Sequence, residues 1–186
     1  MPVEVRIKVR GIEQAEHALE KIPGGARVAI SRAINDGLRK ARTEIKKAIG
    51  AVYNLKSGVI LAGLKREFPA YASPGSLFGL LHIESYKFPV ADFEAVDLNP
   101  AGVRFEEIRG RYSGLPHAFM AGMKSGHSGV FGRIDGTARL RIREITGLSI
   151  PQMLENPKVE PKWQKIVEDE VEQRLDHYVS YLLASK

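Results

Sequence analysis

The stretch that decides the fold is "GARVAISRAINDGLRKARTEIKKAIG", residues 25–50. Its apolar residues recur at steps of three and four, the spacing of one face of an amphipathic helix; they are Ile30, Ile34, Leu38, Ala41, Ile45 and Ala48. The other positions hold many cations and only two acids, Asp36 and Glu44. We therefore predict a long basic helix. Its charge is explained either as a solvated face or as a contact with DNA or an acidic partner.

A second long helix is predicted over residues 158–184, at the other end of the chain. Its apolar positions again follow helical spacing, and they are Trp163, Ile166, Val167, Val171, Leu175, Tyr178, Val179 and Leu182. Its polar positions are rich in acids. The basic and acidic helices can pair within one subunit, or across neighbouring subunits of a ring. The candidate contact residues are Arg32, Arg39, Lys40, Lys46, Lys47, Glu168, Asp169, Glu172 and Asp176.

The remaining pattern is that of β-strands. Residues 3–9 alternate apolar and polar side chains, which predicts a half-buried strand. From about 65 to 145, short apolar stretches alternate with Gly, Pro, Asn and Asp, which is typical of an antiparallel sheet. Within this region, residues 93–114 are expected to form a long surface loop and one strand. The sequence therefore predicts a single α+β domain over residues 1–186, in which a mainly antiparallel sheet packs against the two long helices.

Composition excludes several classes of function. The chain of 186 residues contains no cysteine, so disulfides, thiolate catalysis and cysteine-ligated zinc are ruled out. No apolar run approaches the roughly 20 residues of a membrane span, so we expect no membrane partner. The formal net charge of +6 is compatible with nucleic acid or an acidic protein surface as a partner.

The stretch "AFMAGMKSGHSGVFGR", residues 118–133, resembles a catalytic loop at first sight. However, in Gly126-His127-Ser128-Gly129-Val130 the second glycine comes one position too early, and valine stands where the Gly-x-Ser-x-Gly elbow of a serine hydrolase needs it. The histidines lack the spacing of a metal-binding helix, and no helix follows to hold a phosphate. We therefore predict no catalytic residue, metal or cofactor here. We expect a hairpin with strands at 117–123 and 128–134, a turn at 124–127, and Phe119 and Phe131 packed inward.

A group of cations follows the turn of this hairpin. On a strand, alternate arginines would point to one face and the apolar residues between them to the other. Such a wall could track a phosphate backbone or line a DNA-conducting lumen, and it is also what an ordinary exposed sheet face looks like. No aromatic residues are interleaved with it, so sequence-specific reading is not expected. The candidate residues are Lys124, Arg133, Arg139, Arg141 and Arg143.

Two blocks of the chain resemble the bacteriophage minor tail protein Z family, the tail-completion proteins of long-tailed phages. The first is "ARVAISRAINDGLRKARTEIKKAIGAVYNLKSGVI", residues 26–60. The second, which is more specific, is "HAFMAGMKSGHSGVFGRIDGTARLRIREITGLSIPQML", residues 117–154. Both stand in the family's order, while residues 65–112 match only in character. One departure is "ITGLSIPQML", where the family often has an aromatic residue or leucine before the glycine and a proline after it.

The resemblance implies a structural, non-enzymatic virion component at the head-proximal end of the tail or in the neck, assembled in the host cytoplasm. It implies a tail-completion or terminator-like ring subunit, most often in a hexamer. The partners would be the tail terminator, tube and connector, with DNA backbone passing through the lumen. The alternatives left open by the residues are a free, non-sequence-specific nucleic-acid-binding protein and a dimeric adaptor.

Overall fold

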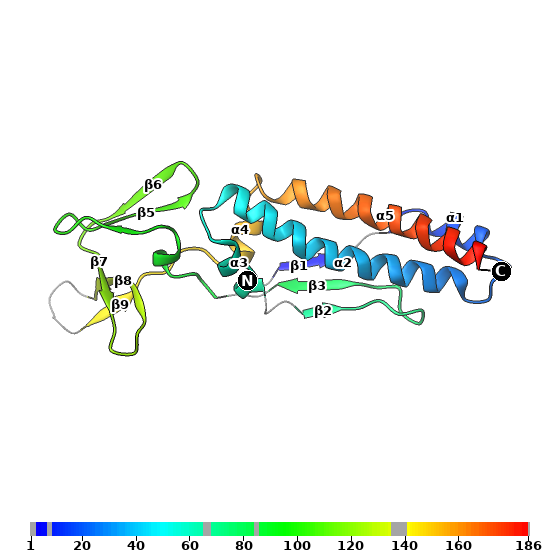
Figure 1. The fold of residues 1–186 in the computed structure, drawn as a ribbon, viewed down its shortest axis with the longest axis horizontal. Helices are drawn as coiled ribbons and strands as arrows, with labels where there is room; N and C mark the ends of the chain where they lie inside the picture. The colour runs from blue at the N-terminus through cyan, green and yellow to red at the C-terminus, as the bar shows by residue number, and fades with distance from the viewer. Residues whose placement is uncertain (1–2, 7–8, 65–67, 84–85, 135–140, 186) are drawn as a thin grey trace.

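The computed structural model describes residues 3–6, 9–64, 68–83, 86–134 and 141–185. The molecule is elongated, with two long helices side by side over a small sheet in one half and β-hairpins gathered in the other (Figure 1). The helices are α1 (Ile12–Ala18), α2 (Gly25–Val52), α3 (Ser57–Gly63), α4 (Ile150–Leu154) and α5 (Glu160–Ala184), with a short 3-10 helix, η2 (Val90–Asp92). This confirms an α+β fold with a long helix in each half of the sequence.

The pair formed by α2 and α5 is the spine of the helical half. The two helices run antiparallel, and the short helix α1 lies along the same end (Figure 1). Along α2 the buried side chains follow the predicted spacing, and Ile30, Ile34 and Ile45 are at most 1% exposed. From α5 they are met by a stripe that includes Val171 and Leu175. Each such fully buried side chain contributes about 1.5–3 kcal/mol, so packing stabilises these helices more than intrinsic propensity does.

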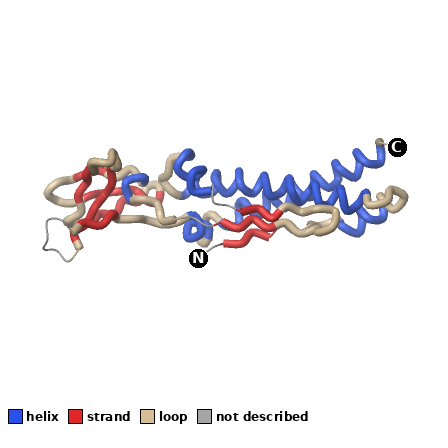
Figure 2. The backbone as a smooth tube through the Cα atoms, turned by 90° about the horizontal axis from the view of Figure 1, so that it is seen from below, coloured by secondary structure: helices blue, strands red, loops and turns tan. Residues whose placement is uncertain are grey.

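Beneath the helices lies the first sheet, which is antiparallel with the strand order β1-β3-β2 (Figure 2). Its strands are β1 (Val3–Arg6), β2 (Phe68–Ala70) and β3 (Leu80–Ile83). In β3, Leu81 and Ile83 are buried while Leu80 and His82 are half-exposed, as a sheet with one covered face requires. The predicted strand at 3–9 is thus present as β1, and its residues 7–8 lie outside the described part.

The β-rich region is divided over separate sheets, whereas the sequence predicted one main sheet. Two further antiparallel sheets have the orders β4-β5-β6 and β7-β8-β9. Their strands are β4 (Val96–Asp97), β5 (Val103–Ile108), β6 (Arg111–Leu115), β7 (Phe119–Gly122), β8 (Ser128–Arg133) and β9 (Ile142–Glu144). The expectation of a long surface loop and one strand at 93–114 is wrong in part, because two strands, β5 and β6, pair as a hairpin there. Gly110 lies in the turn between them with a φ of 77°, a left-handed conformation that glycine adopts without strain.

A continuous core joins the two halves. Ile45 and Ile49 from α2 belong to the same buried cluster as Val103 of β5 and Val130 of β8. Short backbone contacts reinforce the joint, since Asn54 N–H donates to the Glu107 carbonyl at 3.0 Å. At the return to α5, α4 begins with a capping box in which the Ser149 and Gln152 side chains each bond the other's backbone N–H. The β half is therefore anchored to the end of the helix pair.

Candidate functional site

The β7–β8 hairpin is present as predicted, with Phe119 opposite Phe131 and Gly122 opposite Ser128. The connecting turn is closed by a 2.6 Å hydrogen bond from the Met123 N–H to the His127 carbonyl. Gly126 lies in this turn at φ 85°, a conformation that glycine adopts without strain. Phe131 is buried and Phe119 is half-buried, with their ring centroids 6.4 Å apart. The hairpin is therefore held by the packing of the two phenylalanines, and Gly126 is explained by the shape of its turn.

His127 has a carboxylate partner that sequence reasoning missed. Its Nε2 lies 2.7 Å from Oε1 of Glu144 on β9, seventeen positions along the chain. Gly129 makes room for this contact, because a Cβ there would lie 2.5 Å from the same carboxylate oxygen. No pattern in the sequence joins these residues, since only the pairing of β8 with β9 brings them together.

The surroundings of this pair do not form a Ser/His site in the described residues. The hydroxyls of Ser125 and Ser128 make no hydrogen bond to the His127 ring there. A further carboxylate, Asp92 of η2, lies near this pair. Its pKa is raised, mainly because it is partly buried and also because it lies near the negative charge of Glu144. Within the same described part, no group of three or more His, Cys, Asp or Glu residues could hold a metal ion.

The predicted cation wall is only partly assembled on one face. Arg143 lies opposite Gly132, and Arg141 is two positions before it, so both point to the same side of the β7-β8-β9 sheet. Arg133 lies opposite Ile142 and therefore points to the other side. Arg139 falls outside the described residues.

The cations of this sheet that the structure describes are open to solvent. Lys124, Arg133, Arg141 and Arg143 are all exposed. None of the four makes an ion pair with another described residue. The distal sheet therefore presents positive charge on both faces and at its turn, while Glu144 and its partner His127 lie on the face that carries Arg133.

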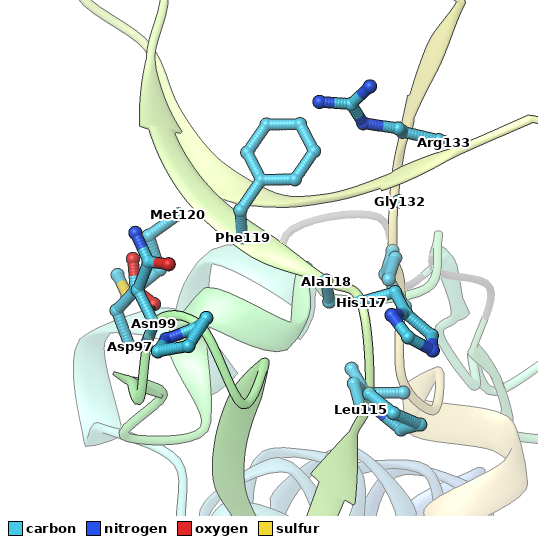
Figure 3. A pocket seen from close by; sticks show the side chains of 12 residues that line it. Asp97, Asn99, Leu115, His117, Ala118, Phe119, Met120, Gly132 and Arg133 are labelled. Atoms are coloured by element: carbon cyan, nitrogen blue, oxygen red, sulfur yellow. Dashed lines mark hydrogen bonds between the residues drawn. The ribbon is translucent and has the colours of Figure 1, made fainter. Parts of the chain in front are cut away.

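An open pocket of about 750 Å³ lies where the turn after β4, the β6–β7 connection and the β7–β8 hairpin meet (Figure 3). In Figure 3, Asp97 and Asn99 gather at one side, while Phe119 and Arg133 lie on the other. Ligand pockets usually enclose most of a small molecule in a mainly apolar lining. This pocket is open and has opposite charges at its two sides, so it differs from such an enclosed site. Of its lining residues, the sequence had singled out Phe119 for packing and Arg133 as a candidate DNA contact, but it gave no sign of the pocket.

The two long helices do pair by charge within one chain, but only in part. Lys40 Nζ lies 3.1 Å from Glu170 Oε2, and Tyr178 donates a 2.7 Å hydrogen bond to Asp36 Oδ2. The hydrogen bonds from Lys40 and Arg174 lower the pKa of Glu170, and the bond to Asp36 raises the pKa of Tyr178. Each helix therefore contributes both a cation and an anion to the seam between α2 and α5, since Asp36 stands on the basic helix and Arg174 on the acidic one.

Most of the predicted contact residues lie outside this seam. Arg39 donates to its helical neighbour Asp36, and Lys47 Nζ lies 2.8 Å from Glu44. The Arg32 guanidinium is 5.8 Å from the Tyr178 ring centroid. Of the acids, Glu168 pairs with Arg10 at 3.2 Å. Of the nine predicted contact residues, those that make no ion pair with another described residue are Arg32, Lys46, Asp169, Glu172 and Asp176.

Comparison with protein-family models, with curated proteins and with solved structures gives no match. Among the described residues, no helix is both long enough and apolar enough to cross a membrane. The chain is thus defined by its own geometry, as an elongated α+β protein with a charged helix pair at one end and an exposed basic sheet at the other.

Proposed function

We propose that this protein is a structural, non-enzymatic subunit of a bacteriophage tail that completes the head-proximal end of the tail. The observation that carries this proposal is that residues of the block 117–154 shape turns, make space for contacts and cap a helix. This block bears the most specific resemblance to the minor tail protein Z family, and its characteristic residues have structural roles. Gly126 forms a turn, Gly129 makes space for Glu144, and Ser149 caps α4. These roles account for the block without any catalytic chemistry.

In this proposal the subunits form a closed ring, most often a hexamer, assembled in the host cytoplasm and retained in the virion at the tail end or neck. The elongated shape supports it, because elongated subunits can pack side by side along a ring axis (Figure 2). The tail terminator, tube and connector would be its neighbours. The open pocket beside the β7–β8 hairpin suits a protruding segment of one of these partners.

The exposed arginines on the distal sheet are the proposed contact with DNA in the lumen. Arg141 and Arg143 point to the same side and have no described ion-pair partner, so their charge is available to phosphates. Such contacts would be independent of base sequence, because they neutralise the backbone and leave the bases unread. Arg139 is a third candidate, predicted by its position in the sequence alone.

The experiment removes the gene from phage-producing cells and restores it in variant form. Without the protein, we expect normal heads and tails that fail to join, visible by electron microscopy. Reversal of Arg141 and Arg143 to Glu should reduce infectivity while leaving the folded protein and its incorporation into particles unchanged. Reversal of Glu13 and Glu16, exposed on α1, to Lys is the control with equally large charge changes. Fully infectious particles that lack the protein would refute the proposed function.

The same exposed arginines favour a second candidate, a free nucleic-acid-binding protein. That protein would bind DNA by itself, with an affinity that falls steeply as salt rises. Filter binding at low and moderate salt separates the two. If the isolated protein does not bind DNA at low salt, this second candidate is excluded. A dimeric adaptor would instead give a stable dimer with no larger ring by mass measurement.

A further inference from the structure

Three acids form a line on α5. Asp169, Glu172 and Asp176, here called the acidic row, are exposed and make no ion pair with any described residue. Their spacing of three and four residues places them on one face of the helix. At 3.6 residues per turn, this face is about 150° around the helix from the buried stripe of Trp163, Val167, Val171 and Leu175. The acidic row therefore faces away from the protein's own core.

Three cations on α2 form a similar line. Arg32, Arg39 and Lys46, here called the basic row, recur every seven residues, which is close to two helical turns. They lie about 130° around α2 from its buried residues. Arg32 and Arg39 are exposed and Lys46 is partly exposed. Arg39 pairs with Asp36 of its own helix, and its charge also acts on Tyr178 of α5, whose ring lies 5.8 Å from the Arg32 guanidinium. The basic row thus runs along the solvent-exposed edge of the contact between α2 and α5.

The two rows lie at the same height along the helix pair. Lys40 is level with Glu170, and Asp36 is level with residues 174–178, as their contacts show. With the helices antiparallel, the middle of the acidic row falls level with Arg39, which is the middle of the basic row. The acidic row spans roughly 10 Å and the basic row roughly 20 Å at 1.5 Å per residue, so the cations extend past the acids at both ends.

A common height is what a ring requires of a contact between neighbours. Cyclic symmetry rotates one subunit onto the next without moving it along the axis, so complementary surfaces must lie level with one another. A basic line and an acidic line on different helices of one chain make a heterologous contact, in which each copy uses both. A second copy is therefore the occupant that fits both surfaces.

Charge alone would give such a contact more selectivity than strength, because exposed ion pairs contribute little each. An apolar residue extends the acidic row. Leu183 follows Asp176 by seven residues, on the same side of α5, and is 50% exposed. Burying it in a contact would add apolar area at the end of the line of charges.

We propose that the basic row of one subunit docks on the acidic row of its neighbour, with the α2–α5 pair running along the ring axis. This inference rests on the proposed ring, and it adds the surfaces, the partner and the direction of the contact. Lys40, Glu170, Asp36 and Arg174 join the helices within a subunit. Arg32 and Arg39 lie beside this group, next to Tyr178 and Asp36, and in the proposed contact their exposed charge also reaches the acidic row of the neighbour.

Charge reversal and its complement test the contact. Changing Asp169, Glu172 and Asp176 to Lys should raise the dissociation constant of the ring at least about tenfold, measured by analytical ultracentrifugation or mass photometry at low salt. Changing Arg32, Arg39 and Lys46 to Glu in the same chain should restore assembly. The control changes Glu13, Glu16 and Glu20, exposed acids at α1, to Lys and should leave assembly intact.

Cysteine crosslinking gives an independent readout, because the natural chain has no cysteine. A variant with Arg39→Cys and Glu172→Cys should give an oxidised ladder of multimers up to the size of the ring, and each single variant should stop at dimers. A ring that assembles equally well after reversal of the acidic row, or a double-cysteine variant that gives no ladder from assembled rings, would overturn this contact and leave the proposed function standing. A protein that is monomeric both alone and in particles would overturn the ring itself.

Discussion

Gly79 offers a sharp test of how the helix pair sits on the first sheet. It precedes β3 and is buried, and a Cβ added to it would lie 2.3 Å from Cγ2 of Ile34 on α2 and 3.3 Å from Cδ1 of Leu38. Ordinary contact begins near 3.4 Å, so Ile34 would have to move by about 3.4 − 2.3 = 1.1 Å. Ile34 is 1% exposed and, as a β-branched residue in a helix, has essentially one side-chain rotamer. Gly79→Ala should therefore force the backbones of α2 and β3 apart.

The expected cost is about 2 kcal/mol, within the usual range for overpacking a core. Urea unfolding followed by the fluorescence of Trp163, the single tryptophan, measures it. Gly58→Ala is the matched control, because a Cβ there meets nothing within 4 Å, and it should be neutral or stabilising by up to about 1 kcal/mol.

A double-mutant cycle identifies the clash as the cause. Ile34→Ala removes the atom that the new methyl group meets, so Gly79→Ala should cost about 1 kcal/mol less in that background than in the natural chain. Additive effects, or a Gly79→Ala variant as stable as the Gly58→Ala control, would refute this account of the packing between α2 and the sheet.

The other predictions concern charge and hydrogen bonds. The pKa of Glu170 is lowered in the folded protein, so its ionised form stabilises the fold above the ordinary pKa of 4.5, and this contribution is lost as the pH falls through the lowered pKa. Glu170→Gln should therefore make the free energy of unfolding depend less on pH on the acid side. Tyr178→Phe removes the hydroxyl that donates to Asp36 and should cost about 1–2 kcal/mol in urea unfolding; no loss of stability would contradict the contact. Gly129→Ala should displace the Glu144 carboxylate from His127 and so change the His127 ring signals in the NMR spectrum. It should lower the free energy of unfolding by less than about 1 kcal/mol, because the carboxylate is flexible. Unchanged ring signals would contradict this close approach.

Local periodicity predicted the elements whose pattern is local. The apolar spacing in residues 25–50 and 158–184 indicated both long helices, and the turn residues around Gly126 indicated the β7–β8 hairpin. The β5–β6 hairpin was missed because "EEIRGRYSG" shows little alternation of apolar and polar residues, and all five residues of β6 are exposed or half-exposed. Its pairing depends on the turn at Gly110 and on contacts with the end of α2.

Pairings between distant segments could not be predicted in the same way. The contact of His127 with Glu144 depends on the register of β8 with β9. The division of the strands into three sheets likewise depends on which strands meet in space, and alternation within one strand does not report its neighbour. The charge of α2 was evident from composition, but only the contacts of Lys40 and Asp36 showed which charges are used within the subunit.

The measurement that bears most directly on the proposed function is a cryo-electron microscopy map of the head–tail junction in particles from cells that carry the gene. We predict a ring of this chain at the head-proximal end of the tail, with α2 of each subunit beside α5 of the next and the distal sheet near the lumen. A junction in which every ring is accounted for by other proteins would contradict the proposal.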